Sequence, residues 1–111
     1  MPGKNIYYQG IYETRQYDVT VNSSVTSIDL SEGNVQNILL NADTTMYLDN
    51  PDEGSYFLII EQGLAYDITW SPDIYWSGGV IPTITQTTGK KDIVHLSYTD
   101  GRFYATITQN Y

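Results

Sequence analysis

The sequence predicts an all-β protein: a single antiparallel β-sandwich or jelly-roll-like domain of eight or nine short strands with little or no helix. Eleven tyrosines among 111 residues, together with many threonines and isoleucines, favour strands. Short stretches alternate between apolar and polar residues, and clusters of Gly, Pro, Asn, Asp and Ser separate them. No stretch shows a helical period, and the length suits one core.

The first fifteen residues differ from the rest because they show no clean alternation. We expect residues 1–15 to form an N-terminal arm or edge segment, and residues 16–111 to form the β domain. The arm is too apolar for a free tail, and tyrosine suits interfaces because its ring is apolar and its tip polar. We therefore expect it to dock on a neighbouring subunit, although a frayed terminus with an edge strand is the alternative. The expected contact residues are Ile6, Tyr7, Tyr8, Ile11 and Tyr12.

Regular alternation begins at residue 17. It predicts strands at 17–21, 25–30, 35–40 and 44–48, with turn clusters between them. The stretch 56–60 reads Y-F-L-I-I and is apolar at every position. A strand of this kind is typically central and covered on both faces. We therefore place Phe57 and Ile59 in the core.

Residues 66–85 contain both tryptophans, two of the four prolines and a glycine pair. Tyr66, Ile68 and Trp70 alternate with polar residues, as in a strand with one buried face. Pro72 interrupts the strand because proline has no N–H to donate, and Gly78 and Gly79 permit a turn. The stretch is predicted to form a buried corner with Trp70 in the core.

The C-terminal strands are predicted to form a hairpin around Asp100-Gly101, a pair that favours a two-residue type I′ turn. This turn pairs Thr99 with Arg102 and sets the register of the whole hairpin. The bulky residues then share one face, and a slip of one residue would mix the two faces. The expected core residues are Val94, Leu96, Tyr98, Phe103 and Ile107.

Composition and charge exclude several classes of protein. Thirteen acidic and five basic residues give a net charge of −8, which is the wrong sign for binding a nucleic-acid backbone. The chain contains no cysteine, so it has neither disulfides nor thiolate metal ligands. No apolar run reaches the ~18 residues of a membrane span, and the N-terminus does not read as a signal peptide. We expect no nucleic-acid and no membrane partner.

Catalytic and metal motifs are not evident. His95 is the single histidine, and it lacks the companion groups of a zinc site or a nucleophilic triad. Asp49, Asp52 and Glu53, with Asp43, offer oxygen ligands for calcium, but their spacing does not match a calcium-binding loop, and turns favour the same residues. The sequence therefore indicates no enzyme, no catalytic residue and no cofactor.

Aromatic residues near the glycine pair suggest a second kind of site. Tyr75 and Trp76 would be able to stack on sugar rings if they were exposed. Aromatic residues beside Gly-Gly and Pro more often pack in a corner, so core packing is the favoured interpretation and glycan contact the alternative.

Several motifs together resemble a β-sandwich domain that recurs in virion proteins of tailed bacteriophages. They comprise Thr69-Trp70, Trp76, Gly78-Gly79, the run from Pro82 to Thr85, and Asp92, with Asp100-Gly101 and the terminal Gln109-Asn110-Tyr111. The upstream stretches N-A-D-T-T-M-Y-L and N-P-D-E-G fit as well, so the resemblance covers about residues 16–111. Such domains occur as head decoration or cement proteins and as terminal domains of tail fibres.

The resemblance implies a virion structural protein on the capsid surface. The expected function is a decoration or cement protein that stabilises the head by binding the major capsid protein and other copies of itself, as a homotrimer. No fibre shaft is evident before the domain. The alternative is the glycan-binding, receptor-binding tip of a tail fibre or spike.

Overall fold

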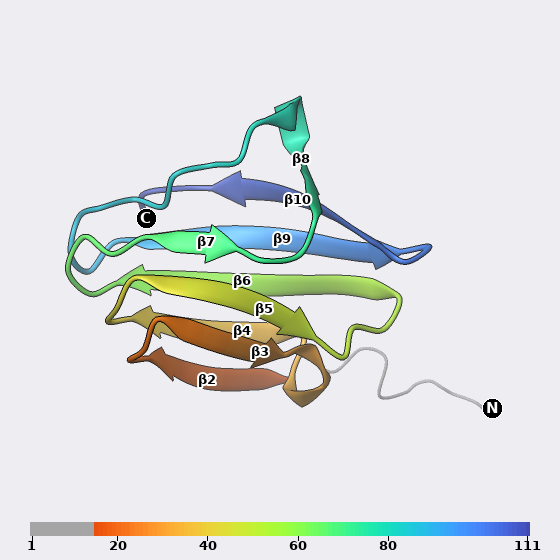
Figure 1. Cartoon of the computed structure of the whole chain (residues 1–111), viewed down its shortest axis with the longest axis horizontal. Coiled ribbons are helices and arrows are strands. Elements are labelled where there is room, and N and C mark those ends of the chain that lie inside the picture. Colours follow the sequence, from red (N-terminus) through yellow and green to blue (C-terminus); the bar gives the residue numbers. More distant parts are fainter. Residues whose placement is uncertain (1–14) are drawn as a thin grey trace.

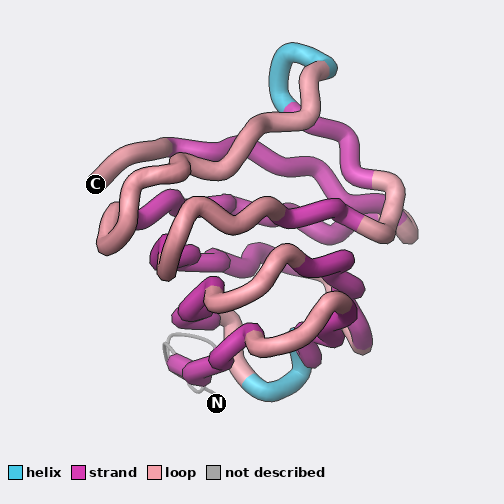
Figure 2. The backbone as a smooth tube through the Cα atoms, turned by 60° about the vertical axis from the view of Figure 1, so that its left-hand side comes forward, coloured by secondary structure: helices cyan, strands magenta, loops and turns pink. Residues whose placement is uncertain are grey.

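The computed structural model describes residues 15–111, and these residues form two β-sheets (Figure 1). The arm residues proposed above, Ile6 to Tyr12, lie outside the described part. Two short 3-10 turns are the helical elements of the described chain, and they stand out in Figure 2. No helix within residues 15–111 is long and apolar enough to cross a membrane. The nine strands are β2 (Gln16–Val21), β3 (Val25–Asp29), β4 (Val35–Leu40), β5 (Thr44–Asp49), β6 (Gly54–Gln62), β7 (Ile68–Trp70), β8 (Ile74–Trp76), β9 (Lys91–Thr99) and β10 (Arg102–Thr108), and the 3-10 turns are η2 (Leu30–Glu32) and η3 (Ser77–Gly79).

From β2 to β7 the chain passes alternately through the two sheets, and this winding path of strands is called the coil below. The larger sheet has the order β2-β4-β6-β9-β10-β8, and the smaller has the order β3-β5-β7. Successive strands from β2 to β7 alternate between the sheets, and each strand from β2 to β5 pairs in parallel with the strand two places later. Each turn of the coil has one strand in each sheet, so β2 to β7 make three turns. The antiparallel strands β9 and β10 then extend the larger sheet (Figure 1).

The predicted strand content and the two sheets are confirmed, but the antiparallel connectivity is wrong. Among the described strands, five of the seven pairings are parallel. The error has a physical cause, because apolar alternation is the same in parallel and antiparallel strands when one face is buried. A three-residue connection such as 22–24 can turn a hairpin or carry the chain around a corner into the opposite sheet.

The corners of the coil are stacked and hydrogen-bonded to one another. The backbone nitrogen of Asn41 donates to the carbonyl oxygen of Val21 at 3.0 Å, and that of Gly63 donates to the carbonyl oxygen of Leu40 at 2.8 Å. A Cβ at position 63 would collide with this Leu40 oxygen and with the side chain of Asn41. Glycine is therefore required at position 63 by the close approach of two neighbouring coils.

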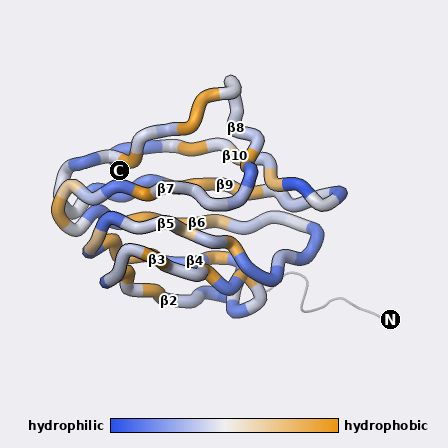
Figure 3. Tube along the Cα trace, in the orientation of Figure 1, coloured by the Kyte–Doolittle hydropathy of each residue, from blue (hydrophilic) through white to orange (hydrophobic). Residues whose placement is uncertain are grey.

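The core lies between the two sheets. Apolar residues recur along the strands, and apolar segments also occur in the β6–β7 connection and after β8 (Figure 3). Two of the predicted core residues do not lie there: Phe57 is 40% exposed, and Ile59 is half-buried on the outer face of the larger sheet. The buried apolar residues are Val21, Ile28, Leu30, Ile38, Leu40, Met46, Leu48, Tyr56, Leu58, Ile60, Trp76, Ile84, Val94, Leu96, Phe103 and Ala105, with Trp70, Tyr98 and Ile107 packed against them.

The C-terminal hairpin has the predicted register. Thr99 pairs with Arg102 and Tyr98 with Phe103, and the pattern continues to Ile93 and Thr108.

The predicted aromatic corner is compact, because the rings of Trp70 and Trp76 meet edge to face with centroids 5.4 Å apart. Trp76 lies in the core, whereas Trp70 is half-buried.

Asp92 holds the end of the chain against the coil. It is the one charged residue among the buried residues of the described chain. Its carboxylate accepts hydrogen bonds from the backbone nitrogen and hydroxyl of Thr85, from the amide of Gln109 and from the backbone nitrogen of Asn110. Burial raises the pKa of this carboxyl, but the hydrogen bonds outweigh burial and leave the pKa below its usual value.

Candidate interaction face

The outer face of the six-stranded sheet contains twice as many strands as the outer face of the three-stranded sheet. Within β6, Phe57, Ile59 and Glu61 alternate with fully buried residues and so point away from the core. Parallel register places Val35 beside Phe57, and antiparallel register places Ile93 beside Ile59. Residues far apart in sequence are thereby gathered onto one surface.

An apolar patch occupies the middle of this face. It comprises the outward residues of three adjacent strands, Val35 and Leu39 of β4, Phe57 and Ile59 of β6, and Ile93 of β9. Phe57 stacks on His95 of β9, with ring centroids 4.8 Å apart and planes inclined by 14°. Within residues 15–111 Phe57 and Leu39 are exposed, whereas Val35, Ile59 and Ile93 are half-buried. Contiguous exposed apolar surface is typical of interaction sites.

The face is electrically balanced in an otherwise acidic protein. Its outward positions carry two acids, Asp18 and Glu61, and two bases, Lys91 and Arg102. The net charge of −8 therefore arises elsewhere in the chain. A neutral face can approach another acidic surface, or a further copy of the protein, with less repulsion than the rest of the molecule.

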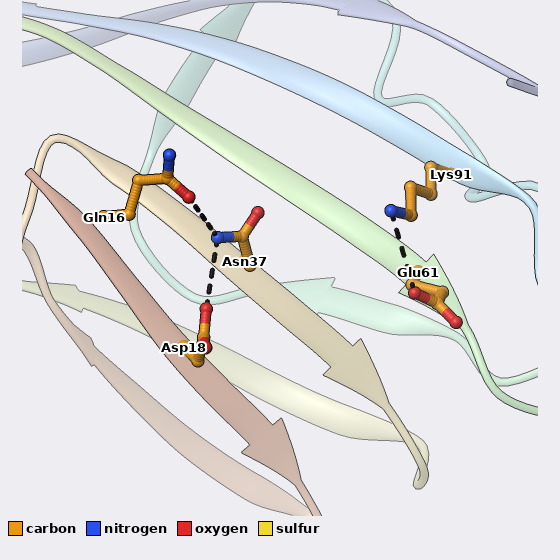
Figure 4. Close-up of polar contacts among 5 residues, drawn as sticks. All are labelled: Gln16, Asp18, Asn37, Glu61 and Lys91. Carbon is orange, nitrogen blue, oxygen red and sulfur yellow. Dashed lines mark hydrogen bonds and ion pairs between the residues drawn. The ribbon is translucent and has the colours of Figure 1, made fainter. Parts of the chain in front are cut away.

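Two groups of polar side chains lie on this face (Figure 4), Gln16, Asp18 and Asn37 on β2 and β4, and Glu61 with Lys91 on β6 and β9. The amide of Asn37 donates to the side-chain oxygen of Gln16 at 3.2 Å and to the carboxylate of Asp18 at 3.1 Å. Lys91 and Glu61 approach to 3.9 Å and remain about half exposed. A hollow of about 160 Å³ lies between these residues. An apolar centre with a polar rim is the usual anatomy of a protein interface.

The smaller sheet offers a contrasting outer face. Its outward residues are mainly polar: Ser27, Thr45 and Thr69 lie there with the isolated apolar residues Val25 and Tyr47. Val25 pairs with Thr45 and Tyr47 with Ser27, so in the paired stretches of β3, β5 and β7 no outward apolar residue lies beside another across the strands. The larger sheet therefore carries the stronger signal for binding a protein partner.

Tyr75 and Trp76, the residues proposed for glycan contact, lie in different environments in the structure. Tyr75 is 54% exposed and stacks on Tyr104, with centroids 5.4 Å apart. Trp76 is 8% exposed and packs in the core, which leaves its ring little surface for a ligand. Alternation within β8 causes this difference, because successive side chains of a strand point to opposite faces.

The turn carboxylates serve local hydrogen bonds. Glu53 accepts from the backbone nitrogen of Asp100 at 3.2 Å, and Asp43 accepts from the backbone nitrogen of Asp67 at 2.8 Å. Hydrogen bonds from the Ser31 hydroxyl, from Asn50 and from the Ser31 backbone lower the pKa of Asp29. Within residues 15–111, no group of three or more histidine, cysteine, aspartate or glutamate side chains is arranged to hold a metal ion.

Sequence reasoning missed the interaction face because it placed Phe57 and Ile59 in the core. The available signal was the Y-F-L-I-I run itself, which is apolar on both faces of one strand. The run correctly indicates a central strand, since β6 lies between β4 and β9. The described chain, however, covers one of its two faces. No family model, curated protein or solved structure matches this chain.

Proposed function

We propose that this protein is a structural binding protein of a bacteriophage virion, a decoration or cement protein that docks on the capsid lattice through the outer face of its six-stranded sheet. The observation that carries the proposal is the apolar patch around Phe57. A central strand that is apolar on both faces is typically buried on both. In the described chain one face of β6 is buried in the core, and the other carries the exposed Phe57.

The virion assignment rests on the motifs of residues 16–111 described above, and the face supports the binding role. Its neutral charge favours approach to a lattice, while the acidic remainder favours solubility at high copy number. Many copies acting together would stabilise the shell even if each contact is weak. Homotrimeric assembly belongs to the same proposal and rests on the resemblance alone.

The proposal is tested by adding purified protein to phage heads that lack it and counting bound copies by quantitative mass spectrometry. We expect a ratio to the major capsid protein near the lattice copy number. Phe57→Glu should abolish binding, because it places an uncompensated charge in the patch. The matched control is Tyr47→Glu, at a comparably exposed ring on the smaller sheet.

Two results would contradict the proposal. One is a handful of copies in each particle, which would favour a tail location. The other is equal loss of binding for Phe57→Glu and Tyr47→Glu, which would show that the open face has no special part. Removing residues 1–15 in a third variant separates the contribution of the arm from that of the face.

A further inference from the structure

Tyr75 and Tyr104 lie side by side at the β8 edge of the larger sheet. They are direct partners in the parallel pairing of β8 with β10. Neighbouring strands are about 4.8 Å apart, so the two side chains start from backbones that are close together. Their rings stack with centroids 5.4 Å apart and planes inclined by 26°. Within residues 15–111 this is the one pair of tyrosines whose rings stack on each other.

Both rings are accessible to small molecules in solution. Tyr75 is 54% exposed and Tyr104 is 42% exposed. Both line a groove of about 380 Å³ on the outer face of the sheet. The guanidinium of Arg102 lies 6.0 Å from the centre of the Tyr75 ring, and this cation–π contact helps to hold the ring in place. The two phenol groups are therefore held near each other and open to an oxidant.

Other tyrosines of the described chain meet only one of these two conditions. Tyr98 contacts the ring of Phe103, which has no phenol group. Tyr47 is as exposed as Tyr104, but no second tyrosine ring stacks on it within the described residues. Contact with another phenol and exposure to solvent coincide at Tyr75 and Tyr104.

We propose that Tyr75 and Tyr104 are a site of dityrosine crosslinking by one-electron oxidants of the haem peroxidase class. Each phenol gives one electron to the oxidant and its phenolic proton to water, which leaves two phenoxyl radicals. The radicals combine through a C–C bond between one Cε atom of each ring. Each bonded carbon then loses its hydrogen as a proton while the ring oxygen takes one up, so both phenols are restored. One hydrogen peroxide accepts the two electrons and two protons and becomes two water molecules.

The crosslink fastens the edge of the sheet. β8 is an edge strand of three residues, and β10 is its neighbour in the larger sheet. A bond between Tyr75 and Tyr104 closes a loop of about 30 residues, which restricts the unfolded chain as a disulfide does. The melting temperature should rise by roughly 10 °C. The inference does not depend on the capsid-binding role, because it needs only the two rings and an oxidant.

The test treats the full chain, at low micromolar concentration, with a haem peroxidase and hydrogen peroxide. The monomer is then isolated by gel filtration, and its dityrosine is measured by fluorescence. Trypsin separates the peptide 16–90 from the peptide 103–111, so the expected crosslink joins these two peptides, and tandem mass spectrometry locates it. We expect dityrosine in the monomer and a loss of at least about tenfold in Tyr75→Phe, because contact within the folded chain replaces an encounter between molecules.

Matched variants identify the two reacting rings. Tyr75→Phe and Tyr104→Phe keep the stacked ring and remove the phenol group, and both should abolish the crosslink. Tyr47→Phe changes an equally exposed tyrosine of the other sheet, and Tyr111→Phe changes the second tyrosine of the peptide 103–111; both should leave the yield unchanged. Oxidation in urea, which separates the strands, should lower the yield in the monomer.

Three results would overturn the proposal. The first is a monomer without dityrosine. The second is a loss in Tyr47→Phe or Tyr111→Phe as large as the loss in Tyr75→Phe. The third is an equal yield in the folded and the urea-unfolded chain, which would show that the stacked geometry has no part in the coupling.

Discussion

Phe57 and His95 stack across two neighbouring central strands on the face that the described chain leaves open. The next residue along β6, Leu58, is fully buried against the smaller sheet. Two adjacent residues of one strand therefore have different environments. One stabilises the fold, and the other is available to a partner.

The first prediction compares these neighbours. Leu58→Ala should lower the free energy of unfolding by about 2–5 kcal/mol, because it leaves a cavity in the core. Phe57→Ala should lower it by about 1 kcal/mol, since the ring is already partly exposed. Urea denaturation followed by tryptophan fluorescence measures both. If both variants lowered the free energy of unfolding by the same amount, Phe57 would belong to the core.

The second prediction concerns the stacked corners. Gly63→Ala should destabilise the protein by about 1–3 kcal/mol, because the new methyl group would collide with the Leu40 carbonyl oxygen of the preceding coil. Leu64→Ala, one residue further on, should change stability by less than about 0.5 kcal/mol, since Leu64 is largely exposed. Thermal unfolding compares the two variants. A neutral Gly63→Ala would show that the coils are not closely stacked at this corner.

The third prediction concerns acid sensitivity. The pKa of Asp92 is lower in the folded protein than in the unfolded chain, so its stabilising effect is complete above the unfolded pKa of about 4 and is lost as the pH falls through the folded pKa. Asp92→Asn should lower stability at neutral pH by about 1.5–3 kcal/mol. It should also flatten the dependence of stability on pH below about pH 5.

The control for Asp92 is Asp73→Asn, which removes an exposed carboxylate from the β7–β8 connection. Urea midpoints at several pH values between neutral and acid provide the measurement. If Asp73→Asn flattens the profile as much as Asp92→Asn does, the acid response arises from the overall charge and not from the Asp92 hydrogen bonds.

The fourth prediction compares two fully buried amides. Gln62 donates to the carbonyl oxygens of Tyr66 and Thr85 and accepts from the Tyr66 backbone nitrogen, so it ties two loops to the coil. Gln62→Leu leaves the Thr85 carbonyl oxygen and the Tyr66 backbone nitrogen without a partner, whereas the Tyr66 carbonyl oxygen keeps a hydrogen bond from Gln86. The substitution should lower the free energy of unfolding by about 2 kcal/mol or more. Hydrogen exchange at the Tyr66 amide should accelerate in the same variant.

Gln36 is the matched comparison for Gln62. Its amide nitrogen donates to the carbonyl oxygens of Asp29 and Gly33, but its side-chain oxygen is buried without a partner. Gln36→Leu removes the unpaired oxygen together with the two hydrogen bonds of the amide nitrogen. It should therefore lower the free energy of unfolding by less than Gln62→Leu does. The reverse order would contradict the assigned hydrogen bonds.

Local patterns determined the strands and one long-range pairing. The alternation of Leu96 and Phe103 with polar neighbours, together with the Asp100-Gly101 turn, sufficed for the β9–β10 register, because a two-residue turn fixes the pairing of the strands that it joins. The coil was also present in the sequence as a weak repeat. V-T-V-N at 19–22 and I-L-L-N at 38–41 lie nineteen residues apart, and the structure stacks them in register.

The sequence by itself determined that this is a β protein with short strands, a central Y-F-L-I-I strand and a tight C-terminal hairpin. Tertiary structure alone decided that the strands pair in parallel and that Phe57 faces outward. Alternation shows that a strand has two faces, but it does not show which of them a second sheet covers. The open patch combines strands distant in sequence, so it exists only after the coil has formed.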